Sequence, residues 1–205
     1  MSKIRTLIFD FGDVFMNLDK KGAMQNALNL FNIKAFEEDM INANIQYEVG
    51  AISTKQFLEF YSNKFPTLNE AQIIDAWNFI IKDFPTHRLE FIQNLAQDKS
   101  FNLMLLSNTN EMHINFIASS VSFYEDFKSC FDKFYLSHEI HLRKPNMDIF
   151  EFVLSENNLK PNECLFVDDT RENTVTANEI GFNTWNIDET KEDVVTIFET
   201  KQALF

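Results

Sequence analysis

Cysteine, glycine and proline are all scarce in this chain of 205 residues, which has two cysteines, four glycines and four prolines. Two cysteines are too few for a disulfide framework, and Cys130 and Cys164 are spaced wrongly for a zinc site. Free thiols in a reducing cytoplasm are therefore expected. The few glycines form no glycine-rich phosphate loop, so nucleotide binding of the P-loop type is not supported.

The sequence also lacks long apolar runs and an excess of positive charge. The apolar run near the N-terminus is interrupted at Asp10, whereas a signal peptide needs roughly 7–15 apolar residues in a row and a membrane span needs about 20. Lysine and arginine number 18 against 31 aspartates and glutamates, which gives a net charge of −13. A surface this negative repels nucleic acid and anionic lipid. We therefore expect a cytoplasmic protein with no nucleic-acid partner and no membrane partner.

What is present is an ordinary globular composition, with 45% apolar and 24% charged residues. Short apolar segments that end in polar turns are typical of buried strands, and helical patterns separate them here. Strands that alternate with helices predict a doubly wound, Rossmann-like α/β fold with a parallel sheet. The expected strands cover residues 6–9, 101–107, 134–136, 164–167 and 182–186.

A different pattern covers residues 20–82, where apolar residues recur at helical spacing without a strand signal. Ser53 with Gln56, and Asn69 with Gln72, have the spacing of capping boxes, which mark helix starts. Four helices in a row predict a small bundle that is inserted after the first strand.

Polar side chains cluster where the predicted strands end, and ligands bind beyond the carboxyl ends of strands in open α/β sheets. Each cluster alone is most often a turn or a helix cap. Together they suit phosphoryl transfer, because they offer a nucleophilic carboxylate, hard oxygen ligands for Mg²⁺, and a hydroxyl and an ammonium for the phosphoryl oxygens. The clusters are Asp10 and Asp13, Ser107-Asn108-Thr109, Arg143-Lys144-Pro145, and Asp168 and Asp169.

Four segments carry a family resemblance, and in chain order they read FDFGDV, LLSNTN, RKPNMDIF and FVDDTREN. They resemble the four motifs of the haloacid dehalogenase-like hydrolase superfamily, and the resemblance extends from Ile4 to about Trp185. It implies a Rossmann-like hydrolase core made of residues 1–17 and 84–205, with an inserted four-helix cap domain at residues 18–83. The chain is most similar to the branch of small bacterial sugar-1-phosphate phosphatases, the α-D-glucose-1-phosphate phosphatase branch.

The resemblance also implies a role for each matching residue. Asp10 would be the nucleophile and would form an aspartyl-phosphate that water then hydrolyses. Ser107 and the backbone N–H of Asn108 would bind the phosphoryl group, and Lys144 would bind the same group and neutralise charge near Asp10. The implied cofactor is Mg²⁺, and the implied partner is a small phosphorylated metabolite. The implied metal site consists of Asp10, the backbone carbonyl of Gly12, Asp169 as a direct ligand, and Asp168 through a water or behind the direct ligands.

One residue departs from the superfamily pattern. Phosphatases of the superfamily usually have a second aspartate two residues after the nucleophile, which acts as acid and base, whereas this chain has Gly12. A positioned general acid contributes about 10²–10⁴-fold to a rate, so we expect activity biased toward good leaving groups such as an anomeric or aryl oxygen. Asp13 is a weaker candidate for the missing role, because adjacent residues on extended backbone point to opposite sides.

Two alternatives to a phosphatase stay open on the sequence. An L-2-haloacid dehalogenase attacks carbon with the same nucleophile, but dehalogenases lack the metal-binding aspartate pair that this chain has at Asp168 and Asp169. A phosphate-ligand binding protein with low turnover is favoured only by Gly12. Glu48, in the predicted cap, either faces the substrate or is an exposed helix residue, as glutamates commonly are.

Overall fold

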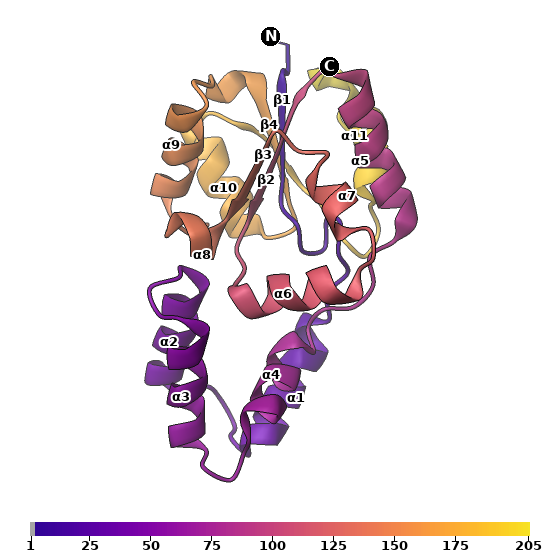
Figure 1. Cartoon of the computed structure of the whole chain (residues 1–205). Helices are drawn as coiled ribbons and strands as arrows, with labels where there is room; N and C mark the ends of the chain where they lie inside the picture. Colours follow the sequence, from indigo (N-terminus) through magenta and orange to yellow (C-terminus); the bar gives the residue numbers. More distant parts are fainter. Residues whose placement is uncertain (1–2) are drawn as a thin grey trace.

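The computed structural model describes residues 3–205, and at its centre lies a parallel sheet with the strand order β3-β2-β1-β4-β5 (Figure 1). Every residue of the two central strands β1 and β4 is buried, as expected when helices cover both faces of a parallel sheet. The doubly wound, Rossmann-like α/β fold is therefore confirmed. The strands are β1 (Thr6–Phe9), β2 (Asn102–Ser107), β3 (Lys133–Leu136), β4 (Cys164–Asp168) and β5 (Asn183–Asn186).

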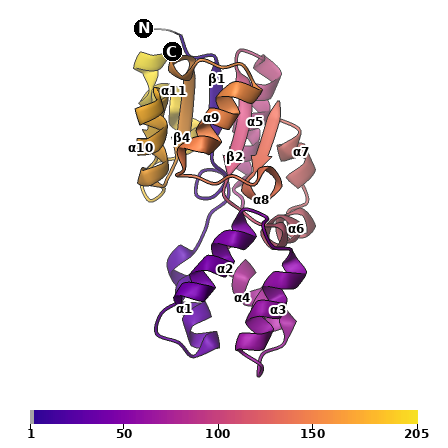
Figure 2. The same ribbon diagram turned by 90° about the vertical axis from the view of Figure 1, so that its left-hand side faces the viewer.

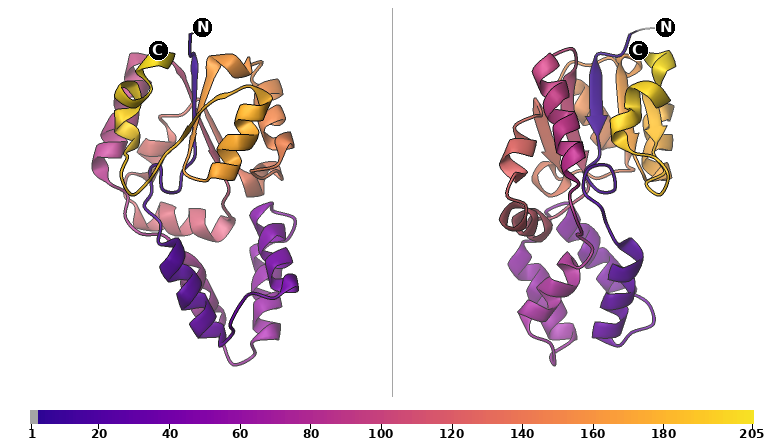
Figure 3. Two further views of the ribbon diagram at one scale, coloured as in Figure 1. Left: turned by 180° about the vertical axis from the view of Figure 1, so that it is seen from behind. Right: turned by 90° about the vertical axis from the view of Figure 1, so that its right-hand side faces the viewer.

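Helices lie on both faces of the sheet, as Figure 1 and the rear view in Figure 3 show. One face carries α5 (Thr86–Asp98), α7 (Tyr124–Lys128) and α11 (Ile197–Thr200), and the other carries α9 (Met147–Glu156) and α10 (Arg171–Ile180). Side chains along a strand alternate between faces, so Leu7 and Phe9 pack in the first layer and Ile8 packs in the second. The apolar runs of the sequence thus supply two separate cores.

Two short helices were not predicted from the sequence, namely α7 and α8 (Ser137–Ile140). With five and four residues, they are too short to show a helical period. After β5 the chain has one short α-helix, α11, with four residues, between the 3₁₀ turns η2 (Val194–Thr196) and η3 (Gln202–Leu204). A further 3₁₀ turn is η1 (Pro161–Glu163). Within residues 3–205, no helix has the length and apolar character needed to cross a membrane.

The inserted helices lie beyond the carboxyl ends of the strands, at the end of the molecule opposite the two termini (Figures 1 and 2). They have a core of their own, built largely from aromatic side chains such as Phe31, Phe57 and Tyr61. Both predicted capping boxes are present, at the starts of α3 and α4. The helices are α1 (Lys20–Phe31), α2 (Glu38–Glu48), α3 (Thr54–Lys64) and α4 (Glu70–Asn78).

Two of the contacts between the inserted helices and the rest of the chain lie at the linkers and around α8. At the linkers, the backbone of Asn17 bonds to Asp83 and Lys82, with N···O distances of 2.9 and 3.0 Å. At the other contact, the loop between α2 and α3 bonds to the segment around α8, where the Ser137 hydroxyl donates to the Glu48 carbonyl at 2.6 Å. The helix α6 (Glu111–Ser120) also packs there, under the strand ends. A cavity is therefore framed between the strand ends and the inserted helices.

Candidate active site

A buried lysine holds two aspartates together at the carboxyl ends of β1 and β4. The Nζ atom of Lys144 lies 2.8 Å from Asp10 Oδ1 and 2.6 Å from Asp168 Oδ2. Its third bond, at 2.7 Å, goes to the carbonyl oxygen of Leu106 in β2. The ammonium therefore has a partner for each of its protons, which offsets the loss of water around a side chain that is only 1% exposed.

The loop that carries Lys144 is fixed by Asn108, the residue after β2. The Asn108 side chain donates to the Lys144 carbonyl at 2.8 Å and accepts from the Lys144 backbone N–H at 2.9 Å. This pair of bonds ties two of the sequence motifs to each other. Asn108 was assigned a phosphoryl-binding backbone N–H from the sequence, and the structure adds that its side chain positions Lys144.

Asp168 is also held by hydrogen bonds from residues that follow it in the chain. Its carboxylate accepts from the Asn173 side chain, at 3.0 Å to each oxygen, and from the Thr170 backbone N–H at 2.8 Å. The next residue, Asp169, lines the cavity with Asp10. Of the two aspartates that end β4, Asp168 is therefore locked among protein groups and Asp169 is the one that faces the cavity.

The protonation of this cluster depends on how much positive charge is near it. Burial raises the pKa of Asp10 to about 7, against the opposing effect of Lys144 and with a further upward effect from Asp168. Burial also raises the pKa of Asp169, although Lys20 acts in the opposite direction. A cation placed beside these carboxylates would favour their ionised forms.

The residues present fit a divalent cation. Asp10, Asp168 and Asp169 each offer an oxygen atom, and these atoms lie within 4.8 Å of one another. Carboxylate oxygens are the ligands that Mg²⁺ takes in proteins, commonly only one or two of them together with waters. Counted with Asp13, the site has four carboxylates and two ammonium groups, an excess of two negative charges that one divalent cation would neutralise.

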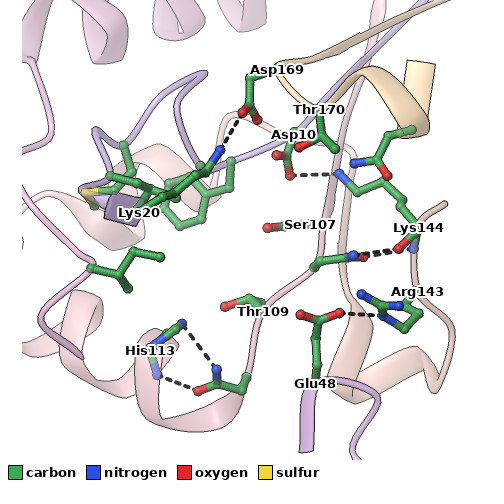
Figure 4. Close-up of a pocket in the computed structure, with 18 of the residues that line it drawn as sticks. Asp10, Lys20, Glu48, Ser107, Thr109, His113, Arg143, Lys144, Asp169 and Thr170 are labelled. Carbon is green, nitrogen blue, oxygen red and sulfur yellow. Dashed lines mark hydrogen bonds and ion pairs between the residues drawn. The ribbon is translucent and has the colours of Figure 1, made fainter. Parts of the chain in front are cut away.

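Lys20 supplies the second ammonium, and it lies outside the four sequence motifs. It is the first residue of α1, and its Nζ atom lies 2.5 Å from Asp169 Oδ2 and 2.9 Å from Asp13 Oδ2. Figure 4 shows Lys20 and Lys144 reaching toward Asp169 and Asp10 from opposite sides. No sequence pattern points to Lys20, because only the folding of α1 beneath the strand ends brings it to the acidic cluster.

Each carboxylate oxygen of Asp13, the weaker candidate for the missing role, has a partner in the structure. Asp13 has a φ of 55°, so its backbone is not extended and the expected direction of its side chain on extended backbone does not apply. Its Oδ1 atom accepts from the Leu18 backbone N–H at 2.8 Å, and its Oδ2 atom pairs with Lys20. One carboxylate oxygen is thus bonded within the linker and the other is paired with the first residue of α1.

The position of the missing aspartate is closely packed. A Cβ atom added to Gly12 would lie 2.6 Å from Cδ1 of Leu18, which is too close for any side chain unless Leu18 moves. Both residues line the same cavity. An acid at position 12 would therefore require Leu18 to shift, and the contact is with the end of that flexible side chain.

The cavity has a volume of about 490 Å³ and combines groups from the strand ends with groups from the inserted helices. Ser107, at the end of β2, lines it beside Asp10. On the opposite wall, Glu48 of α2 pairs with Arg143, with a distance of 2.6 Å between Oε1 and Nε (Figure 4). Glu48 was expected either to face the substrate or to be an exposed helix residue, and in the structure it lines the cavity. Its ion pair with Arg143 was not predicted.

His113 forms part of the wall next to α4. Its Nε2 atom lies 3.1 Å from the Trp77 carbonyl oxygen, and its Nδ1 atom lies 3.2 Å from the amide nitrogen of Asn110. Burial lowers the pKa of His113 to about 4. A neutral ring that donates from Nε2 and accepts at Nδ1 satisfies both contacts, so this histidine joins α6 to α4 without carrying charge.

The fold and this site together define an α/β protein with an acidic cluster that fits a divalent cation, at the carboxyl edge of its sheet and covered by inserted helices. Compared with known proteins, residues 4–181 match the family described as haloacid dehalogenase-like hydrolase. The chain belongs to this family, and the family that its four motifs suggested is confirmed.

Relatives with a known function or structure cover nearly the whole chain. It is 30% identical over 193 residues to a D-ribitol-5-phosphate phosphatase of Bacteroides thetaiotaomicron, across 89% of this chain and 91% of the relative. The structure is similar to that of a haloacid dehalogenase family enzyme from the same organism in complex with magnesium. The TM-score is 0.84 and the identity 30%, over 96% of this chain and 99% of the other. A mutant of that enzyme, in complex with magnesium and inorganic phosphate, matches with a TM-score of 0.81 at 28% identity, over 95% and 98% of the two chains.

Proposed function

We propose that this chain is a Mg²⁺-dependent phosphatase that hydrolyses small phosphorylated metabolites, with sugar phosphates and their polyol counterparts as the substrate class. The observation that carries the proposal is the placement of Asp10, which lies 2.8 Å from a buried ammonium and shares an oxygen cluster with Asp168 and Asp169. This combination suits a carboxylate nucleophile that attacks a charged phosphoryl group. The free cysteines are in line with a cytoplasmic enzyme.

The comparisons support the same reaction. The relative at 30% identity is a phosphatase of a polyol phosphate, and the similar structures contain magnesium, one of them with inorganic phosphate. These are properties of those proteins, and the present chain has the residues to share them. Its site has an excess of negative charge that a divalent cation would balance, and a lysine and a serine that face the same cavity.

In the proposed mechanism, Asp10 Oδ attacks phosphorus, and the bond from phosphorus to the ester oxygen breaks. Ser107 donates its hydroxyl to a phosphoryl oxygen, together with the backbone N–H of Asn108. Lys144 keeps its ammonium beside Asp10 and offsets the charge of the transferred group. Water then attacks the phosphorus of the aspartyl-phosphate, which releases phosphate and restores Asp10. Because Gly12 has no side chain, the departing oxygen takes its proton from water.

The residues that would hold Mg²⁺ are Asp10, Asp169 and the backbone carbonyl of Gly12, with Asp168 behind them. When bound, the ion supplies a positive charge that lowers the energy of the phosphoryl oxygens as charge builds on them. Asp168 orients Lys144, since its carboxylate accepts from that ammonium and from Asn173. Asp169 would thus bind the cation, whereas Asp168 binds the Lys144 ammonium.

We further propose that residues 18–83 act as a cap domain over a core made of residues 1–17 and 84–205. The cavity walls come from both parts, with Glu48 on the cap side and Arg143 on the core side. A charged pair of this kind can accept and donate hydrogen bonds to the hydroxyls of a sugar or polyol. The cap would then select the leaving group while the core performs the chemistry.

Neither alternative is favoured. A dehalogenase does not require the acidic oxygen cluster that Asp169 completes. A protein that only binds phosphate would not need a carboxylate held 2.8 Å from a lysine amine at the bottom of the cavity.

The test is phosphate release from a panel of sugar, polyol, aryl and simple alkyl phosphates, with Mg²⁺ and with EDTA. The proposal predicts turnover only with Mg²⁺, and none in the Asp10→Asn variant. Faster release from aryl than from simple alkyl phosphates is also expected, because Gly12 supplies no acid. Turnover that persists in EDTA or in Asp10→Asn would contradict the mechanism, and equal rates for aryl and alkyl esters would contradict the leaving-group argument.

A further inference from the structure

Lys20 is the one cationic group of the site that comes from the inserted helices among the described residues. It bridges Asp13 and Asp169 through its Nζ atom, yet half of its side chain is exposed. It lines both the main cavity and a second cavity of about 350 Å³ between the inserted helices. Lys20 therefore lies where the two cavities adjoin.

The two ammonium groups differ in how firmly they are held. Lys144 is 1% exposed and has three acceptors on the core, so it cannot leave without exposing buried charge. Lys20 is 50% exposed and has two acceptors, one of which is Asp169. A divalent cation that binds Asp169 must come close to the Lys20 ammonium, and like charges repel. Of the two lysines, Lys20 is the one that is free to move.

Position 12, where phosphatases of the superfamily usually have the acid for the leaving group, has no side chain in this protein. Gly12 offers no acid there, and each carboxylate oxygen of Asp13 already has a partner. Lys20 is bound to Asp13, the residue next to Gly12, and lies within the same cavity wall. If the Lys20 ammonium dissociates from Asp169 but stays close to Asp13, it would be near the ester oxygen while negative charge develops on that oxygen.

We infer that Lys20 competes with the divalent cation for Asp169 and, once displaced, supplies positive charge to the leaving-group oxygen in place of the acid that Gly12 lacks. The inference rests on the proposed phosphatase function. Lys20 does not protonate the oxygen in this scheme. It stabilises the developing alkoxide electrostatically, and the proton comes from water after the ester bond breaks.

The first test is the Mg²⁺ affinity of the substrate-free protein, measured by calorimetry. Lys20→Met removes the competitor and should bind Mg²⁺ about threefold to tenfold more tightly than the unmodified chain, the range expected for a half-exposed ion pair. Lys21→Met is the matched control, because Lys21 is the exposed neighbour on the same helical turn. It should leave the affinity within about twofold. An affinity that is unchanged or weaker in Lys20→Met would overturn the inference.

The second test is the leaving-group dependence of kcat at saturating Mg²⁺. Lys20→Met should lower kcat for an alkyl phosphate by about tenfold to 100-fold and leave an aryl phosphate nearly unaffected, because only a poor leaving group needs the added charge. Lys20→Arg, which keeps the charge, should recover part of the loss. An equal loss on both esters would show a purely structural role and overturn the inference. An unmodified chain that hydrolyses no phosphate would instead refute the proposed function, and the affinity measurement would still decide the competition.

Discussion

The buried lysine offers the sharpest test of how this site is held together, and the change is Lys144→Met. Methionine keeps most of the side-chain volume but removes a charge that pairs with Asp10 and Asp168. In the metal-free protein, both carboxylates would then stay buried without a cation. Breaking a buried ion pair by removing one partner costs about 3–5 kcal/mol of stability, so we expect a loss of this size.

The surface provides a matched control for the charge alone. Lys64 also bridges two carboxylates, those of Glu37 and Asp39, at 2.8 and 2.7 Å. Its partners are more than half exposed, and exposed pairs contribute only about 0–1 kcal/mol. Lys64→Met should therefore change the free energy of unfolding by less than about 1 kcal/mol.

The assay is urea-induced unfolding of the unmodified chain and of both variants in EDTA, followed by circular dichroism. Repeating it with Mg²⁺ should restore part of the stability lost in Lys144→Met, because the ion brings positive charge back to the same oxygens. Equal losses in the two variants would refute the reasoning. They would mean that burial adds nothing to the strength of the pairing around Lys144.

Three further predictions concern other parts of the site. The first combines Gly12→Asp with Leu18→Ala, because the Leu18 side chain lies 2.6 Å from a Cβ added at position 12. The double variant should hydrolyse alkyl phosphates up to about 10⁴-fold faster than Leu18→Ala alone. No gain in rate would contradict the role of a missing acid at position 12. The pKa of His113 is lowered to about 4 in the folded protein, against about 6.5 in the unfolded chain. The stability that its neutral ring contributes is therefore fully present above about pH 6.5 and is lost as the pH falls toward 4. The free energy of unfolding should fall by about 3 kcal/mol on this account by pH 4. In urea unfolding at a series of pH values, the free energy of unfolding of His113→Gln should fall less steeply as the pH is lowered. Gly50→Ala, at a φ of 66° and with its Cβ 2.1 Å from the His138 carbonyl oxygen, should lower the melting temperature by several degrees, and a variant as stable as the unmodified chain would contradict this packing.

Most of the fold could be predicted because its signals are local. The alternation of apolar strands with helical patterns requires no knowledge of distant contacts, and the capping boxes at Ser53 and Asn69 mark helix starts within four residues. The helices around Tyr124 and Ser137 were not predicted, since they are too short to have a period.

The site could be predicted from the sequence for those residues that lie at the ends of parallel strands. Asp10, Ser107 and Asp168 lie at the carboxyl ends of strands that pair in parallel, so these ends must meet at one edge of the sheet. Lys20 and Arg143 could not be assigned in this way. Their positions depend on how the inserted helices lie against the core, which no local pattern encodes.

In the proposed mechanism, Asp10 carries the phosphoryl group during turnover. The most direct measurement is mass spectrometry of peptides from the protein, quenched in acid within milliseconds of mixing with Mg²⁺ and a substrate that the panel identifies. The account predicts one phosphoryl group on the peptide that contains Asp10, which disappears as the substrate is consumed and is absent in Asp10→Asn. Turnover without a phosphoryl group at Asp10, or with one on another residue, would contradict the account.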